Sequence, residues 1–223
     1  MKFIRPALAV IALTLTVGAT DALAQRGGGG PQEPMTFFIT STPMDGANLG
    51  GITGADAHCQ TLAAAADRGD ATWHAYLSTQ GPGAVNARDR IGSGPWHNHG
   101  GSQIAANVAD LHGDVMRDRN QVNRDEALNE NGERVNGRGD SPNQHDILTG
   151  SDSHGNAFPA GDDKTCSNYT SNADGMGSAQ VGHHDRSGGG SSSWNSAHGS
   201  RGCSQENLVG TGGNGYFYCF ATN

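Results

Sequence analysis

Two short histidine motifs carry the side chains best suited to binding a transition metal. His97 and His99 are two residues apart, so an extended chain places both imidazoles on one side. His183, His184 and Asp185 add two imidazoles and a carboxylate. Imidazole and carboxylate groups bind zinc or copper, although histidines in a chain with ten of them also serve simply as hydrogen-bonding groups. Metal binding and hydrogen bonding are therefore open alternatives for both motifs.

Oxygen donors gather in two further stretches of the chain. They are Asn129, Glu130, Asn131, Glu133, Asn136 and Asp140 in the first stretch, and Asp152, Asp162 and Asp163 in the second. Such hard oxygen ligands suit calcium, but neither stretch follows the Asp-x-Asp-x-Asp-Gly pattern of a calcium loop. Acidic turns are also commonly solvated turns without an ion. Calcium is thus one candidate cofactor, and the sequence leaves the cofactor open.

Aromatic residues among amides and carboxylates are the usual components of a sugar-binding surface. An aromatic ring stacks on the sugar while polar side chains bond its hydroxyl groups. The candidate ligand-binding residues of this kind are Trp96, Asn98, Tyr169, His184, Asp185, Trp194 and Asn195. The alternative is that the tryptophans fill the core of a thin domain, since tryptophans are highly buried on average. The sequence has no nucleophile elbow and no phosphate-binding loop, so a binding protein is favoured over an enzyme.

One helix and one strand are the clearest elements that could position these groups. From Thr53 onward, apolar or small residues recur at the spacing of one helical face, with Thr53 as the expected N-cap, Asp56 as its capping-box partner and Gly69 as the expected stop. This face includes Cys59. At the C-terminus, residues 215–221 predict a strand that directs Tyr216, Tyr218 and Phe220 to one side and Phe217, Cys219 and Ala221 to the other.

Four cysteines in an exported chain predict two disulfides, and the count alone permits three pairings. Cys59 lies on the inward face of the expected helix, and Cys219 has a definite side on the last strand. We therefore expect a Cys59–Cys219 bridge that ties the two ends of the domain together. Cys166 and Cys203 then form the second bridge and close the loop that holds His183 and Trp194.

The remaining segments predict a loop-rich mixed α+β domain. Further strands are expected at residues 36–41, 73–78, 146–150 and 165–171. Residues 81–143 have weak periodicity, and we expect ordered long loops there with a short helical patch at 104–111. Residues 175–199 are rich in Gly and Ser.

The N-terminus predicts export. Residues 1–24 combine a basic start, an apolar run and a small-residue cleavage site, as in a secretory signal peptide. A membrane anchor is the weaker alternative, because the run is shorter than the roughly 20 residues needed to span a bilayer. Residues 25–35 are Gly- and Pro-rich and predict a flexible leader, and residues 36–223 form the expected domain. A formal net charge of −8 argues against a nucleic-acid partner.

Several motifs together resemble a family of secreted bacterial lectin-like domains related to the C-type lectin and endostatin folds. They are the stretches 36–41, 49–59, 73–78, 147–151, 165–171, 193–195 and 218–220. The resemblance implies a small twisted antiparallel sheet with one or two flanking helices, nested disulfides and long ligand-binding loops. The sequence departs from the calcium-dependent sugar-binding members: it lacks their Glu-Pro-Asn and Gln-Pro-Asp tripeptides, and Ser196 follows Asn195 where they have an aspartate.

The leading hypothesis is therefore a secreted or periplasmic binding module of C-type-lectin-like (endostatin-like) architecture. Its long loops would recognise carbohydrate or another cell-surface ligand. A second hypothesis is a metal-dependent extracytoplasmic enzyme that uses the His/Asp cluster. A third is a structural or adhesion domain without a small ligand.

Overall fold

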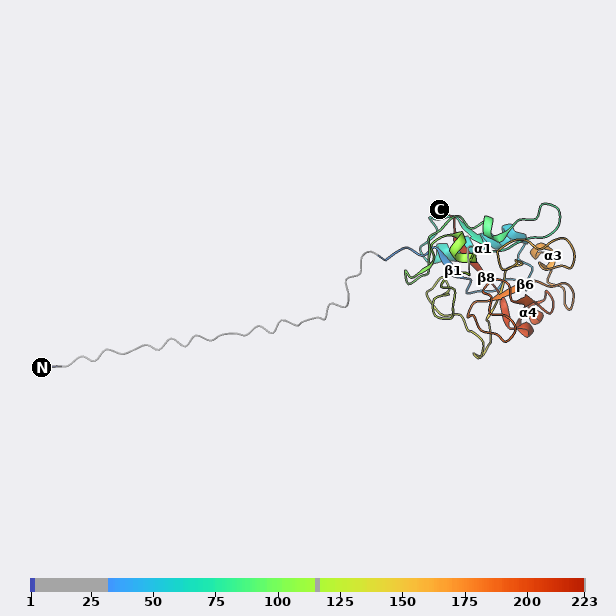
Figure 1. Ribbon diagram of the computed structural model, residues 1–223. Helices are drawn as coiled ribbons and strands as arrows, with labels where there is room; N and C mark the ends of the chain where they lie inside the picture. The colour runs from blue at the N-terminus through green and yellow to red at the C-terminus, as the bar shows by residue number, and fades with distance from the viewer. Residues whose placement is uncertain (3–31, 115–116, 223) are drawn as a thin grey trace. The chain divides into compact units, whose positions relative to one another are not determined.

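The computed structural model describes residues 1–2, 32–114 and 117–222 of the chain (Figure 1). The expected signal peptide, apart from its first two residues, and most of the expected leader lie outside the described residues. Residues Gln32–Asn223 form one compact unit of mixed α and β structure. The end of the expected leader belongs to it, because Met35 is buried in the core and the Gln32 side chain donates to the His99 carbonyl oxygen. Among the described residues, no helix is both long and apolar enough to cross a membrane.

A small sheet is organised around the last strand, β8 (Gly213–Ala221). Strands β1 (Phe37–Ile39) and β2 (Trp73–Ala75) pair with it in antiparallel orientation, and β5 (Asp146–Leu148) pairs with it in parallel. The sheet continues through β6 (Gln180–His183) to β7 (His198–Gly199). A separate hairpin joins β3 (Trp96–His97) to β4 (Gln103–Ala105).

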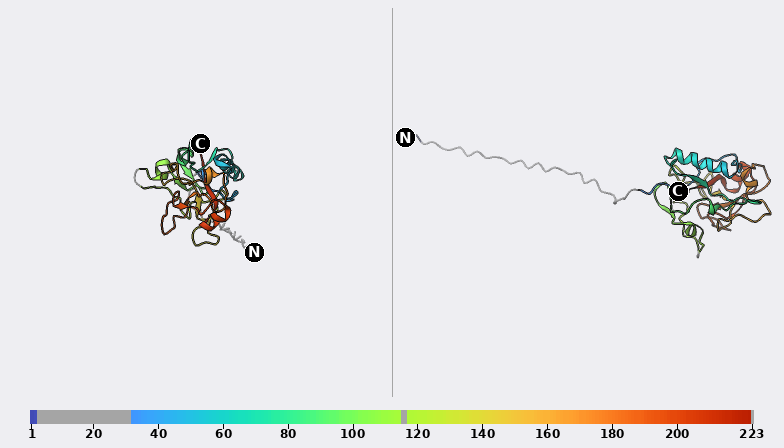
Figure 2. Two further views of the ribbon diagram at one scale, coloured as in Figure 1. Left: turned by 90° about the vertical axis from the view of Figure 1, so that its right-hand side faces the viewer. Right: turned by 90° about the horizontal axis from the view of Figure 1, so that it is seen from above.

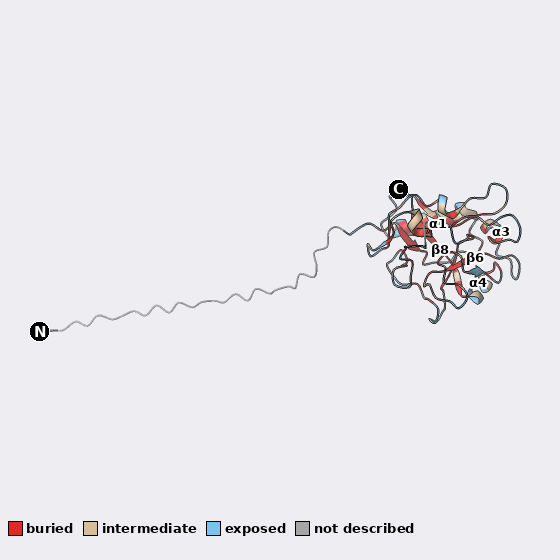
Figure 3. Cartoon of the chain, in the orientation of Figure 1, coloured by how far each residue is buried: buried red, intermediate tan, exposed pale blue. Residues whose placement is uncertain are grey.

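The alternation of β8 divides the apolar core into two clusters, as the sequence predicts. Phe217, Cys219 and Ala221 belong to one cluster, whereas Tyr216, Tyr218 and Phe220 belong to the other. Every residue of β8 except Asn214 is buried, and Figure 3 shows the strand inside the domain. Because successive side chains of a strand point to opposite faces, one strand can fill both clusters.

The long helix α1 (Gly51–Ala65) lies along one side of the domain, as Figure 2 shows. It packs on β2. Its buried stripe consists of Ala55, Cys59 and Ala63, in agreement with the expected periodicity. The expected cap is wrong: the N-cap is Gly50 in the left-handed conformation, with no side-chain cap. Asp56 instead accepts from the Ala75 amide and pairs with an arginine, so it joins α1 to β2. The helix also ends at Ala65, four residues before Gly69.

Both predicted disulfides are present, Cys59–Cys219 and Cys166–Cys203. The first joins α1 to β8 across 160 residues of chain, and the second closes a loop of 37 residues that contains β6 and β7.

The strand expected at residues 165–171 is wrong. Cys166–Tyr169, labelled α3, is instead a turn whose four residues all have positive φ angles between 49° and 62°. Side-chain bonds hold this left-handed turn, since Asp163 accepts from the Ser167 amide and Thr165 accepts from the Asn168 amide. Such bonds compensate the cost of about 1–2 kcal/mol per left-handed residue.

The other helices are short. They are the 3-10 turn η1 (Ala87–Asp89), α2 (Val108–His112), which replaces the second half of the expected helical patch, and α4 (Gln205–Thr211), which the sequence reading did not predict. Helix α4 packs on β8.

Candidate metal centre

Four side chains with metal-binding atoms converge where β5, β6 and β7 meet. The Nε2 atoms of His145, His183 and His198 lie 3.2, 3.3 and 3.6 Å from Oδ1 of Asp146. The Nε2 atoms of His183 and His198 are 2.9 Å apart. Asp146, His145 and His183 are buried, and His198 is partly exposed, with 42% of its side chain accessible. We call these four residues the His/Asp centre.

Strand pairing brings these residues together from distant parts of the sequence. Asp146 begins β5 and lies directly opposite His183, the last residue of the antiparallel strand β6. His198 begins β7 and pairs with Val181, two residues from His183 and therefore on the same face. Gly213 of β8 lies beside Asp146, where a Cβ atom would come within 2.6 Å of the Asp146 carbonyl oxygen. Glycine at this position allows β8 to approach the centre closely.

In two of the three histidines, the Nδ1 atom, which points away from Asp146, lies within hydrogen-bond distance of an acceptor. Nδ1 of His145 lies 3.4 Å from Oδ1 of Asp185, and Nδ1 of His198 lies 3.2 Å from the Gly199 carbonyl oxygen. Since an acceptor requires the proton on Nδ1, the Nε2 atom of each neutral ring carries a lone pair. The lone pair of His145 therefore faces Asp146 at 3.2 Å, and that of His198 faces Nε2 of His183, which lies within hydrogen-bond distance at 2.9 Å. A carboxylate that orients a histidine in this way is a common partner of metal-binding histidines.

Asp146 itself is unusual for a buried carboxylate. It is 3% exposed, and within the described part of the chain neither of its oxygens has a hydrogen bond of normal geometry. A buried charge without hydrogen bonds is costly unless a counter-ion balances it. His183 is in a similar state, because its Nδ1 atom also lacks a hydrogen-bond partner of normal geometry.

The pKa values of the neighbouring groups follow from burial and contacts. Burial works to lower the pKa of His183, but Asp146 outweighs it, so the pKa lies above its ordinary value. Burial works to raise the pKa of Asp185, yet bonds from His145 and from the Arg138 and Ser187 amides hold it far below its usual range. Asp185 is therefore a carboxylate. Burial lowers the pKa of His184.

The predicted histidine motifs are only partly brought together. His183 belongs to the centre and Asp185 supports it through His145, whereas His184 points elsewhere and donates through Nε2 to the Asn136 carbonyl oxygen. His97 and His99 do not lie in the centre. Nδ1 of His99 instead donates to the Glu130 carbonyl oxygen.

The expected sugar-binding aromatics are core residues. Trp96 and Trp194 are 1% exposed and Tyr169 is fully buried. Trp96 packs edge-on against Phe220, and the Tyr169 hydroxyl donates to the Ser78 carbonyl oxygen. Stacking on a sugar needs an exposed ring face, and none of the three rings offers one.

The two amides of the same prediction are also buried and bonded within the protein. Nδ2 of Asn98 donates to Glu126, and Nδ2 of Asn195 donates to the Tyr76 hydroxyl at 2.9 Å. Their polar groups therefore stabilise the loops from inside.

The expected oxygen-donor loops use their side chains as turn acceptors. Asn129 accepts from the amides of Asn131 and Glu133, and Asp152 accepts from those of His154 and Asn156. These bonds give Asn129 and Asp152 a structural role in their turns.

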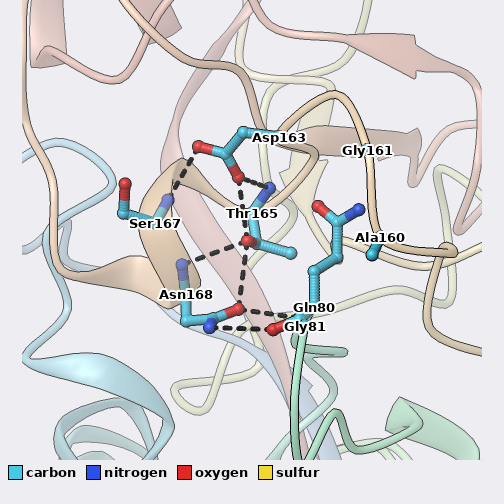
Figure 4. Close-up of a pocket in the computed structure, with 8 residues that line it drawn as sticks. All are labelled: Gln80, Gly81, Ala160, Gly161, Asp163, Thr165, Ser167 and Asn168. Atoms are coloured by element: carbon cyan, nitrogen blue, oxygen red, sulfur yellow. Dashed lines mark hydrogen bonds between the residues drawn. The ribbon is translucent and has the colours of Figure 1, made fainter.

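A polar pocket of about 260 Å³ lies beside the left-handed turn (Figure 4). Most of its polar groups bond one another. Asn168 accepts from the Gln80 amide at 2.7 Å and donates to its carbonyl oxygen, while Asp163 accepts from Thr165 and Ser167. The pocket thus has few side-chain groups left for a ligand.

The His/Asp centre, by contrast, opens into a pocket of about 360 Å³ that His145, His183 and His198 help to line. Three imidazoles and a carboxylate can hold a divalent transition metal ion there. No protein-family model and no curated protein matches this chain.

Proposed function

We propose that this chain is an exported domain that binds a divalent transition metal ion, Zn²⁺ before others, at the His/Asp centre. One observation carries the proposal: three imidazole nitrogens surround one oxygen of a buried carboxylate that has no normal hydrogen bond. The Nε2 lone pair of His145 faces the same oxygen at 3.2 Å. A metal ion between these atoms would be bound by both electron pairs and would balance the charge of the carboxylate.

The distances favour a shared metal over a hydrogen-bonded cluster. A charge-assisted N–H···O bond is about 2.7–2.9 Å long, shorter than the 3.2–3.6 Å from Asp146 to the three histidines. Ligands at about 2.0–2.1 Å from one ion lie roughly 2.9–3.6 Å apart when their angles at the metal are about 90–120°. Four of the six separations among these atoms, from 2.9 to 3.6 Å, fall in this range, although the 2.9 Å between His183 and His198 is also a normal hydrogen-bond distance. His145, Asp146 and His183 form the tightest group, because their ligand atoms all lie within 4.8 Å of one another.

The ligand set indicates the type of ion. Imidazole suits Zn²⁺, Cu²⁺, Ni²⁺ and Fe²⁺, while Ca²⁺ and Mg²⁺ prefer all-oxygen sites. Three histidines and one aspartate therefore support a transition metal over the calcium considered from the sequence. The proposal shares metal binding with the second hypothesis from the sequence, but its ligands differ from the sequence motif His183-His184-Asp185. Only His183 belongs to both sets.

The C-type-lectin-like relation and the export of the chain are part of the same proposal. A small mixed sheet, few helices and two nested disulfides support the relation, and disulfides are typical of extracytoplasmic proteins. A glycan or cell-surface partner stays a prediction from the resemblance. The aromatic residues expected to stack on a sugar are buried, so the structure adds no support for a glycan partner.

Metal analysis and calorimetry test the proposal. Purified protein should contain close to one transition metal ion per chain, and stripped protein should bind Zn²⁺ with the same stoichiometry. His198→Gln should weaken Zn²⁺ binding by more than about tenfold, since even the hydrogen-bond partners of ligands contribute this much. His198 lies at the surface, so this variant should still fold. His154→Gln, an exposed histidine outside the centre, is the matched control. Absence of stoichiometric metal together with absence of Zn²⁺ binding would refute the site.

A further inference from the structure

The pocket above the His/Asp centre is rich in hydrogen-bond donors. Beside the histidines it is lined by Arg138, Asn143, Ser191 and the three glycines 188–190. The glycine segment lies close to His183, one of the proposed metal ligands, because a Cβ atom on Gly188 would come within 2.8 Å of its Nδ1 atom. The backbone itself, with no side chain in between, thus forms this wall of the pocket.

Arg138 is a cation without a carboxylate partner. Most described arginines pair with an aspartate, as Arg124 does with Asp140 and Arg186 with Asp118. The Arg138 side chain is exposed at the pocket and makes no ion pair with any described residue. Only its backbone amide is tied down, by a bond to Asp185 on the far side of His145. The backbone of Arg138 is therefore fixed beside the centre, and its guanidinium group has no ion-pair partner among the described residues.

Other donors in the pocket are also free. In the part of the chain that the structure describes, the backbone amides of the three glycines 188–190 donate to no protein acceptor. The Asn143 side chain accepts from the His145 amide through its oxygen, and its NH₂ group has no acceptor among the described residues. Free backbone amides that point the same way can bind an anion. The only carboxylate of the centre, Asp146, faces the metal position.

The charge of the pocket contrasts with that of the protein. A divalent ion on three neutral histidines and one aspartate leaves one net positive charge. Arg138 adds a second, and the carboxylate of Asp185 behind His145 offsets one of them, so the net charge is about +1. This arises in a chain whose formal net charge is −8. Arginine binds planar carboxylates and phosphates through two parallel N–H bonds. Building on the proposed metal site, we infer that the pocket binds an oxyanion, the carboxylate or phosphate group of a ligand, between the metal ion, Arg138 and the glycine amides.

Cobalt-loaded protein provides a direct test. Co²⁺ bound to the centre gives a visible absorption spectrum that responds to its ligands, and inorganic phosphate and acetate are titrated in separate experiments. We expect at least one of the two anions to change the spectrum with saturation. Arg138→Gln should weaken that anion by at least about tenfold, as loss of a charge-assisted bond implies, while leaving the anion-free cobalt spectrum unchanged. Arg119→Gln removes the same charge from an exposed position outside the pocket and should behave like the original chain.

The outcomes separate the two proposals. A response to phosphate alone, to acetate alone or to both supports the inference and identifies the source of the oxyanion. A normal cobalt spectrum that neither anion changes overturns the inference and leaves the metal site standing. Equal anion affinity of Arg138→Gln and the original chain overturns it as well. Failure to bind Co²⁺ overturns both the metal site and the oxyanion pocket, and in that case the purified protein should also contain no stoichiometric transition metal.

Discussion

Removal of the two disulfides one at a time should separate the stability of the fold from the affinity of the metal centre. The variants are Cys59→Ala/Cys219→Ala and Cys166→Ala/Cys203→Ala. The first opens a link across 160 residues that joins α1 to β8. The second opens a link across 37 residues, and this shorter loop carries His183 and His198. The two bridges therefore constrain different properties.

The effect on stability follows from the loop lengths. In the chain-entropy model, a bridge across 160 residues stabilises the protein by about 5 kcal/mol and one across 37 residues by about 4 kcal/mol. All four cysteines are fully buried, so the loss of sulfur packing is similar in both variants and leaves the difference near 1.3 kcal/mol. Urea unfolding of the metal-free protein, followed by the fluorescence of the buried tryptophans, measures this difference. Cys59→Ala/Cys219→Ala should have the lower midpoint.

The effect on metal affinity should have the opposite order. Cys166→Ala/Cys203→Ala frees the loop that supplies two of the four ligands, so it should weaken Zn²⁺ binding more than the other variant does in calorimetry below the unfolding transition. The reasoning would be refuted if Cys166→Ala/Cys203→Ala were the less stable variant, or if the long-range variant lost more metal affinity. Either result would mean that the loop lengths and the ligand positions do not govern the two properties.

Three further predictions concern single residues. Asp185→Asn should lower Zn²⁺ affinity about 10–100-fold by calorimetry, because its bond to His145 orients a ligand; an unchanged affinity would remove Asp185 from the site. Gly182→Ala should lower the urea unfolding free energy by at least about 2 kcal/mol, because its Cβ would lie 1.9 Å from the Trp194 carbonyl oxygen, whereas Gly189→Ala meets nothing within 4 Å and should be neutral. Burial lowers the pKa of His112 below its ordinary 6.5, so the unfolded chain binds a proton that the native state resists, and stability should fall as the pH drops below about 6.5. His112→Gln should reduce this fall in urea midpoints measured between pH 7.5 and 5, and an unchanged slope would contradict the assignment.

The sequence predicts the parts of the fold that depend on local periodicity. The stripe of α1 and the alternation of β8 are each visible in one segment, and each places its cysteine on the buried side. These two facts favour the Cys59–Cys219 pairing, which the structure confirms. Cys166–Cys203 then follows because two cysteines remain.

The sequence fails where side-chain hydrogen bonds replace backbone preference. Thr165, Tyr169 and Thr170 are strand-forming residue types, and they led to the expectation of a strand. The structure has a left-handed turn there because Thr165 and Asp163 bond nearby backbone amides. Such local bonds compete with the ladder of a sheet, and residue type does not show which of the two prevails.

The His/Asp centre could be predicted only in part for a similar reason. The sequence identifies His183 and Asp185 because they belong to the contiguous motif His183-His184-Asp185. The sequence does not identify His145, Asp146 and His198 as ligands, although His145 directly precedes the strand predicted at 146–150 and Asp146 begins it. Their contact with His183 depends on the pairing of β5 with β6 and of β6 with β7. β6 and β7 lie in a Gly/Ser-rich segment that has no clear periodicity, so neither strand was expected.

Strand β8 runs from the His/Asp centre to the Cys59–Cys219 disulfide. It begins at Gly213 beside Asp146 and reaches the disulfide at Cys219, six residues later. At about 3.3 Å per residue, the metal centre and the Cys59–Cys219 bridge lie about 20 Å apart along the strand. Substitutions separated by more than about 10 Å usually act independently, within about 0.5 kcal/mol. Loss of the bridge and loss of a metal ligand should therefore have additive effects on stability, and the Cys166–Cys203 loop is the element through which a disulfide can influence the metal.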